Sequence, residues 1–203
     1  MSSPARHQSK AKLLTAAIDV VRAKGYNATR VEDVCAAAGV TKGSFFHHFK
    51  GKDELGLAAA DAWRDYANEL FAAAAFHQLA DPLDQILGYL DLRKSMLVDE
   101  QRYCFAGTVV QEVYATHPDL LAACARSIRE HVDMLRPTIA AAMEKYRVES
   151  SWSADGLACH IQVVLQGAFI LAKAQGGSQV AADSIDHLRR YVELIFDPHR
   201  AGN

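Results

Sequence analysis

Apolar residues recur with helical spacing along most of the chain. The first stripe occupies positions i, i+3, i+4 and i+7 and consists of Leu14, Ala17, Ile18 and Val21. This spacing predicts an amphipathic helix over about residues 9–24, and Gly25 follows where a left-handed residue would end it. No segment shows the alternation of a β-strand, so the pattern predicts an all-α fold.

Two short helices are predicted after this first one. Thr29 and Glu32 have the spacing of a capping box, in which a hydroxyl and a carboxylate satisfy free amides at the start of a helix. Gly39 lies in the turn that follows, and Thr41 is the expected N-cap of the third helix. A longer helix followed by two short helices around a Gly-containing turn is the arrangement of a helix-turn-helix.

Longer helices are predicted in the rest of the chain, over about residues 52–76, 82–97, 103–114, 119–147, 157–174 and 185–195. Asp81 and Pro82 suit the start of the second of these. Pro137 lies inside the fourth, where we expect a kink or a break. Gly176 follows the fifth and should end it.

The charged residues are distributed unevenly along the chain. Of the 203 residues, 50% are hydrophobic and 23% charged, as in globular proteins, and the net charge is -2. Residues 1–52 contain nine Lys and Arg and three Asp and Glu, about +6, whereas residues 53–203 contain 13 basic and 21 acidic residues, about −8. The positive charge therefore coincides with the predicted helix-turn-helix, as contact with DNA phosphates requires.

Several classes of protein are not expected. The N-terminus has no apolar signal segment, and the unbroken apolar runs are far shorter than the roughly 18 residues of a membrane span, so we expect a cytoplasmic protein. The four cysteines are scattered without a Cys-x-x-Cys pair, which predicts reduced thiols and no metal site. No G-x-S-x-G, G-x-G-x-x-G, H-E-x-x-H or P-loop motif occurs, so we expect neither an enzyme nor a bound cofactor.

Three segments resemble the DNA-binding domain of the TetR family of transcriptional regulators. They are residues 25–31 (GYNATRV), residues 38–49 (AGVTKGSFFHHF) and the Lys52-Asp53-Glu54-Leu55 segment. The resemblance covers about residues 10–57. It implies an all-helical homodimer, with a helix-turn-helix DNA-binding domain at 1–52 and a helical effector-binding and dimerisation domain at 53–203.

The resemblance and the helix-turn-helix pattern together select candidate DNA contacts: Thr29, Arg30, Thr41, Lys42, Gly43, Ser44, Phe46, His47, His48 and Lys52. Thr41 and Lys52 are expected at phosphates, and the leading end of the third helix at base edges. Phe46 stands where the family usually has Tyr, whose hydroxyl meets a phosphate. His48 has two interpretations, a phosphate contact or a structural hydrogen bond.

The larger domain is expected to hold a small-molecule effector between its helices. Candidate lining residues are Trp63, Tyr66, Tyr89, Tyr103, Cys104, Gln111, Tyr114, Met134, His160, Gln166 and Phe169. For each of them, ordinary core or interface packing is the alternative. Aromatic, amide and imidazole groups together favour an apolar ligand with one or two polar groups.

Dimerisation is expected through the last two helices. Residues 157–174 are apolar on nearly all sides, so a second face must be covered, either by a partner subunit or by the protein's own chain. A two-fold dimer predicts a palindromic operator with half-sites about one turn apart. A repressor released by its effector is the first hypothesis. An effector-independent architectural protein and a thiol sensor acting through Cys104 are the alternatives.

Overall fold

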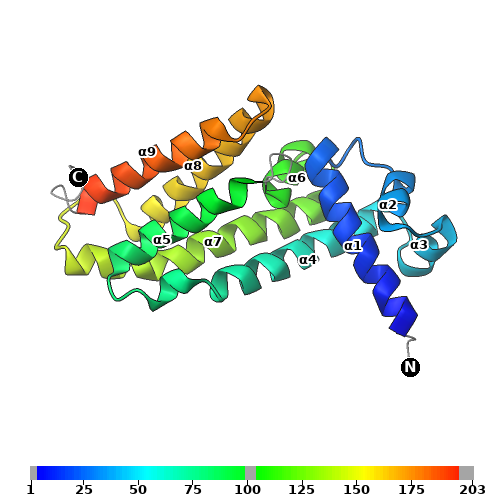
Figure 1. Cartoon of the computed structure of the whole chain (residues 1–203), viewed down its shortest axis with the longest axis horizontal. Helices are drawn as coiled ribbons and strands as arrows, with labels where there is room; N and C mark the ends of the chain where they lie inside the picture. Colours follow the sequence, from blue (N-terminus) through cyan, green and yellow to red (C-terminus); the bar gives the residue numbers. More distant parts are fainter. Residues whose placement is uncertain (1–3, 99–103, 197–203) are drawn as a thin grey trace. The chain divides into compact units, whose positions relative to one another are not determined.

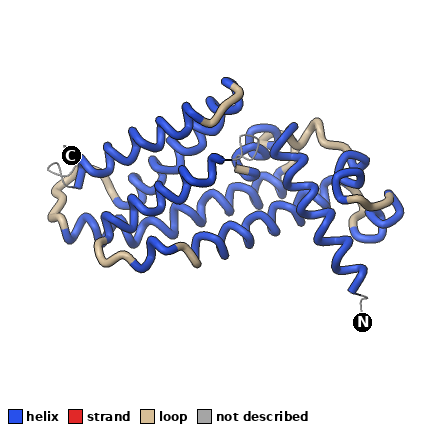
Figure 2. The backbone as a smooth tube through the Cα atoms, viewed as in Figure 1, coloured by secondary structure: helices blue, strands red, loops and turns tan. Residues whose placement is uncertain are grey.

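The computed structural model describes residues 4–98 and 104–196, and within these ranges the chain is helical and contains no strand (Figure 2). This confirms the all-α prediction. The elements are α1 (Pro4–Lys24), α2 (Val31–Ala38), α3 (Lys42–His48), α4 (Lys52–Ala72), the 3-10 turn η1 (Ala75–Gln78), α5 (Pro82–Ser95), the 3-10 turn η2 (Met96–Val98), α6 (Phe105–Val113), α7 (Pro118–Lys145), α8 (Ala154–Gln175) and α9 (Gln179–Phe196). The α-helices are labelled in Figure 1.

The described residues form two compact units. Unit 1 contains residues 4–70 and 104–127, and unit 2 contains residues 71–98 and 128–196. Unit 1 therefore holds the three N-terminal helices together with most of α4, all of α6 and the first turns of α7. The predicted functional boundary after residue 52 lies at the first residue of α4, inside this unit.

The first three helices of unit 1 pack on one another around a small apolar core. Leu13 of α1, Val34 of α2 and Phe45 of α3 are fully buried. Phe49, directly after α3, is also buried, with its ring centroid 5.7 Å from that of Phe45. A helix of seven residues is not stable by itself, so α3 depends on tertiary contacts. Its two buried aromatic side chains, at i and i+4, supply those contacts.

The ends of these helices test the predicted caps. Gly25 has a φ of 89° after α1, and the Thr41 hydroxyl accepts a hydrogen bond from the Ser44 amide at 3.1 Å, so both predictions are confirmed. The prediction of a capping box at Thr29 and Glu32 is wrong. Arg30 is the N-cap of α2, and its amide donates to the carboxylate of Asp33 at 2.7 Å.

Two longer helices also differ from their predicted course. The predicted helix over residues 52–76 ends at Ala72, and the turn η1 follows. The sequence predicts a kink or a break at Pro137, and α7 runs through Pro137 without a break. Two other ends follow the pattern: Asp81 caps α5 by accepting from the Leu83 amide at 2.9 Å, and Gly176 ends α8 with a φ of 71°.

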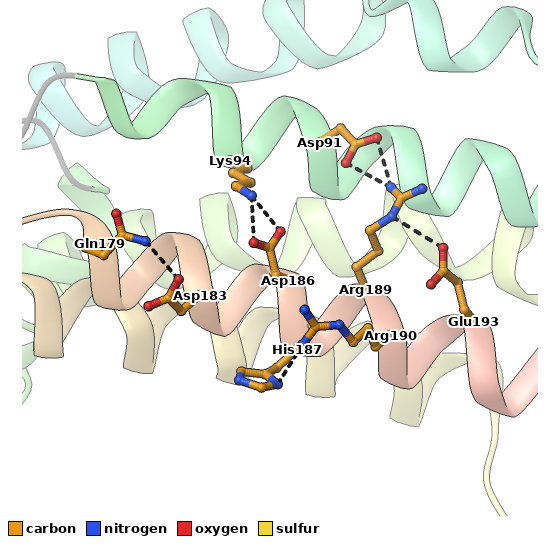
Figure 3. Close-up of polar contacts among 9 residues, drawn as sticks. All are labelled: Asp91, Lys94, Gln179, Asp183, Asp186, His187, Arg189, Arg190 and Glu193. Atoms are coloured by element: carbon orange, nitrogen blue, oxygen red, sulfur yellow. Dashed lines mark hydrogen bonds and ion pairs between the residues drawn. The ribbon is translucent and has the colours of Figure 1, made fainter. Parts of the chain in front are cut away.

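In unit 2, α8 and α9 lie side by side and α9 also packs on α5 (Figure 1). Buried Ile185, Leu188 and Val192 supply the apolar contact of α9. Ion pairs join its polar side to α5 (Figure 3): Lys94 Nζ lies 2.6 Å from Asp186 Oδ1, and Arg189 Nη1 lies 2.8 Å from Asp91 Oδ1. These partly exposed pairs fix the register of the two helices more than they stabilise the fold.

By length and composition, α8 could cross a membrane, whereas the short unbroken apolar runs of the sequence predict no such segment. Leu157, Ile161 and Leu165 on one side of α8 are buried within the protein. The helix is thus a core helix on that side, whereas Val163, Ile170 and Leu171 of the same helix are exposed.

Candidate nucleic-acid interface

The side of α3 opposite its buried phenylalanines is open to solvent. Phe46 is 59% exposed, and Lys42, Gly43 and His47 are exposed as well. We call these four residues the α3 surface. The exposed ring of Phe46 is suited to contact with sugars and thymine methyl groups in a DNA groove. The side chains of Lys42 and His47 are suited to contact with phosphates.

Lys42 is held by one exposed partner. Its ammonium group forms an ion pair with Glu32 of α2, and this ion pair is the main reason that the pKa of Glu32 is lowered. Because both side chains are exposed, solvent screening leaves the pair little net strength. A phosphate group can therefore replace Glu32 as the partner of Lys42, while the carboxylate itself repels DNA.

Lys52, the first residue of α4, is more firmly held. Its Nζ donates to the carbonyl oxygen of Asn27 at 3.2 Å and lies 4.4 Å from the centroid of the Tyr26 ring. Burial lowers the pKa of Lys52, against the opposing effect of Asp53 and Glu112. The turn after α1 thus orients the Lys52 side chain. Because the side chain is already ordered, it should lose little conformational entropy when it binds a phosphate.

Two other candidate side chains, Thr29 and His48, have structural partners. The Thr29 side chain is only 4% exposed and its hydroxyl donates to the carbonyl oxygen of Gly25 at 2.6 Å, so Thr29 cannot offer that hydroxyl to DNA in this structure. The His48 ring is hydrogen-bonded to the Ser9 hydroxyl at 2.7 Å, which supports the structural interpretation of His48. Arg30 is exposed, and Ser44 is half-buried beside the Thr41 cap.

Two carboxylates bind the turn after α1, and the sequence analysis did not predict them. Glu112 of α6 accepts hydrogen bonds from the amides of Tyr26 and Asn27, at 3.1 and 2.7 Å. The Tyr26 hydroxyl donates to Asp53 of α4 at 2.7 Å, and burial raises the pKa of Tyr26. His117 lies 3.7 Å from the same carboxylate. The turn after α1 is therefore bonded to both α6 and α4.

Glycine makes this close approach possible. A Cβ atom built on Gly25 would lie 2.4 Å from Glu112 Oε1, far inside van der Waals contact. A Cβ on Gly56 would lie 2.9 Å from the Tyr26 ring. The Gly25-Tyr26 dipeptide was visible in the sequence, but nothing local to it indicates Glu112, which is 86 residues away from Tyr26.

The candidate effector residues are divided between the two units. Trp63, Tyr66, Cys104, Gln111 and Tyr114 belong to unit 1, and Tyr89, Met134, His160, Gln166 and Phe169 belong to unit 2, whereas Tyr103 lies outside the described residues. Tyr66, Gln111, Tyr114 and His160 are exposed. Tyr89 and Phe169 are buried in unit 2.

The cysteines of the described segments are free thiols. Burial raises the pKa of Cys35, and raises that of Cys124 to about 12. Both therefore remain protonated thiols that react slowly with electrophiles. Cys104 is the N-cap of α6, and its sulfur accepts from the Gly107 amide at 3.4 Å. Within residues 4–98 and 104–196, no His, Cys, Asp and Glu side chains cluster as a metal site would need.

Comparison with known proteins agrees with this geometry. Residues 13–59 match the family described as "Bacterial regulatory proteins, tetR family". These residues form a TetR-family DNA-binding domain. Over 119 residues the chain is 31% identical to Transcriptional regulator AcuR of Cereibacter sphaeroides, covering 58% of the chain and 53% of AcuR. A shorter stretch of 51 residues is 49% identical to HTH-type transcriptional regulator CymR of Pseudomonas putida, a quarter of each protein.

Solved structures of TetR-family regulators share the fold over nearly the whole chain. One from Agrobacterium tumefaciens has a TM-score of 0.84 at 20% identity, covering 94% of this chain and 99% of that one. One from Rhodobacter sphaeroides has a TM-score of 0.81 at 23% identity, covering 89% and 97%. The curated relatives are named as regulators and not as enzymes, in line with the absence of catalytic motifs.

Proposed function

We propose that this TetR-family protein is a cytoplasmic repressor that binds a palindromic DNA operator as a homodimer and is released by a small-molecule effector. The observation that carries the DNA-binding part is the α3 surface: an exposed face with Lys42 and Phe46 on a helix that is anchored from behind by Phe45 and Phe49. The match to the TetR family over residues 13–59 supports the same assignment.

The proposal of a homodimer is based on exposed apolar side chains of α8 and α9. We call Val163, Ile170, Leu171, Tyr191 and Leu194 the α8–α9 face; each is more than two-fifths exposed, and Val163 is 67% exposed. Their spacing puts them on the sides of the two helices that the protein's own chain leaves uncovered. Gly167 lies in the same stripe, and a Cβ there would meet nothing within 4 Å. A second copy covering this face would form a four-helix interface.

The proposed release mechanism acts through α4 and α6. Lys52 begins α4, and Glu112 of α6 holds the turn that also accepts the hydrogen bond of Lys52. An effector that favours a second position of these helices would move Lys52 and the turn together. Because the two DNA-binding segments of a dimer must match successive major grooves, a small shift suffices to lower operator affinity.

The test is fluorescence anisotropy with the DNA upstream of the protein's own gene, at two salt concentrations. We expect Lys42→Ala and Lys52→Ala each to weaken binding by about tenfold and to reduce the slope against salt by about one counterion. Lys145→Ala in unit 2, which removes an equal charge from an exposed pair with Asp81, is the matched control. Wild-type binding no tighter than that of the two variants contradicts the assignment.

The architectural alternative predicts a different outcome of the same experiment. A protein of that kind binds unrelated DNA as tightly as the upstream DNA, and no small molecule changes its affinity. Preference for the upstream DNA of at least about a hundredfold over random sequence is expected for a regulator.

A further inference from the structure

A buried cation lies in the interior of unit 2 without an acidic partner. Arg93, in the last turn of α5, is only 6% exposed. Its one hydrogen bond runs from Nη1 to the Tyr89 hydroxyl at 3.4 Å. Among the residues the structure describes, no carboxylate forms an ion pair with it. Its neighbour Lys94, by contrast, pairs with Asp186 of α9 (Figure 3).

Aromatic rings surround the guanidinium. Its central carbon lies 5.6 Å from the ring centroid of Phe71, 5.5 Å from that of Phe169 and 5.9 Å from that of Tyr89. Cation–π attraction offsets part of the cost of removing this charge from water, but it does not neutralise the charge. Four of the five N–H donors of the guanidinium remain without an acceptor within the described residues.

The neighbouring polar groups are also incompletely paired. The amide nitrogen of Gln162 on α8 donates to the Tyr89 hydroxyl at 2.8 Å, while its buried Oε1 has no hydrogen-bond partner. Turning the amide over would leave its two N–H donors unpaired instead, so an unpaired polar atom remains in either orientation. Buried polar atoms without partners are rare in folded proteins and point to a missing group.

The nearby histidine does not compensate the cation. His131 of α7 packs edge-on to Phe71, with ring centroids 4.7 Å apart. Burial, with a smaller contribution from Arg93, lowers the pKa of His131 to about 3. The ring is therefore neutral at physiological pH, and the cluster of Arg93, Tyr89, Gln162 and His131 has a net positive charge with more donors than acceptors.

We infer that Arg93 and Tyr89 bind the carboxylate of a small organic monoacid, whose apolar part packs against Phe71 and Phe169. A guanidinium can donate two parallel hydrogen bonds to a carboxylate, and the Tyr89 hydroxyl can donate a third. This inference rests on the proposed effector and gives its chemical class. The site also includes a residue of α4, because Phe71 is in the last turn of the helix that begins at Lys52.

The experiment measures binding to the full-length protein by thermal shift and calorimetry. The probes are the sodium salts of butyrate, hexanoate, benzoate and phenylacetate, each compared with its neutral primary amide. We expect at least one acid to raise the Tm saturably, with an affinity at least about thirtyfold higher than that of its amide. If no acid binds, or if acids and amides bind equally, the inference is overturned.

Variants separate a ligand site from a structural role of Arg93. Arg93→Met removes a buried charge that has no acidic partner, so its Tm should equal or exceed that of the wild type, while acid binding should fall by at least about thirtyfold. Arg93→Lys keeps the charge and loses the paired donors, so intermediate affinity is expected. Arg189→Met, which removes a guanidinium from the exposed pair with Asp91, should keep wild-type acid binding. A folded Arg93→Met variant that still binds the acid contradicts the inference.

A final arm distinguishes this inference from the proposed function. If an acid binds through Arg93 but leaves operator affinity unchanged, the anion site stands and its role as an effector site fails. If neutral molecules release the operator and acids do not bind, the effector mechanism stands and the anion site fails.

Discussion

The α3 surface and the α8–α9 face are both exposed, but they differ in how favourably water solvates their side chains. On the α3 surface, Lys42 has one exposed protein partner, Glu32, which solvent or a phosphate can replace. On the α8–α9 face, apolar side chains such as Val163 gain nothing from water. We therefore expect the first surface to bind its partner reversibly and in a salt-dependent way, and the second to bind a permanent partner.

The largest effect is expected from a charge on the α8–α9 face. Val163→Glu leaves the single chain folded because the side chain is exposed there, but it places a carboxylate in the proposed dimer interface. Loss of the dimer removes simultaneous binding of two half-sites, so operator affinity should fall by about a hundredfold or more. Analytical ultracentrifugation and anisotropy measure the two effects.

Leu79→Glu is the matched control, since Leu79 is also exposed but lies outside the α8–α9 face. It should sediment and bind DNA as the wild type does. A Val163→Glu protein that remains a dimer would show that this face is not the interface.

A tenfold effect is expected when the support of the turn after α1, which holds Lys52, is removed. Glu112→Ala leaves the amides of Tyr26 and Asn27 without their acceptor, and hydrogen bonds to a charged group contribute about 1.5–3 kcal/mol each. The Tm should fall by several degrees and operator affinity by about tenfold. Glu112→Gln, which keeps one acceptor oxygen, should lie between. Unchanged Tm and affinity in both variants would mean that the turn is held by α4 alone.

Phe46→Tyr is expected to tighten operator binding by about threefold to tenfold. The ring is already exposed, and a hydroxyl on it can donate to a phosphate, worth about 0.5–1.5 kcal/mol. The control is Tyr66→Phe on α4, an exposed tyrosine outside the α3 surface, which should bind as the wild type. Equal or weaker binding by Phe46→Tyr would place the ring against a base or sugar instead.

The smallest effect concerns the carboxylate beside Lys42. Glu32→Gln removes a negative charge near the phosphates and frees Lys42, so affinity should rise about twofold to threefold at low salt. Because both groups are exposed, the gain should disappear at high salt. Glu69→Gln in the last turn of α4 changes the net charge equally and should have no effect. A gain that persists at high salt would indicate a change other than charge.

Features that depend on a few neighbouring residues could be predicted from the sequence. The Thr41 cap, the Gly25 and Gly176 ends and the burial of Phe45 all follow from local spacing, and the structure confirms them. The capping box failed for a local reason as well: the Thr29 amide, which Glu32 would have to cap, donates to the carbonyl oxygen of Tyr26 at 3.1 Å, and the helix begins one residue later at the Arg30 N-cap.

Features that depend on distant residues were missed. Glu112 and Arg93 have no motif around them, and each matters only through side chains that the fold brings to it. Tyr89 and Phe169 were selected from the sequence as aromatic residues for an effector site, but the cation between them was not. Tyr114, selected with them, is the most exposed of the large hydrophobic residues described.

The two hydrogen bonds from Tyr26 and Asn27 end on the two oxygens of a single carboxylate. Whatever separates Glu112 from the turn breaks both together, so the two amides should exchange with deuterium at one common rate of opening. The shared exchange rate measures how often the hydrogen bonds between Glu112 and the turn open. An effector that acts through these bonds should increase that rate.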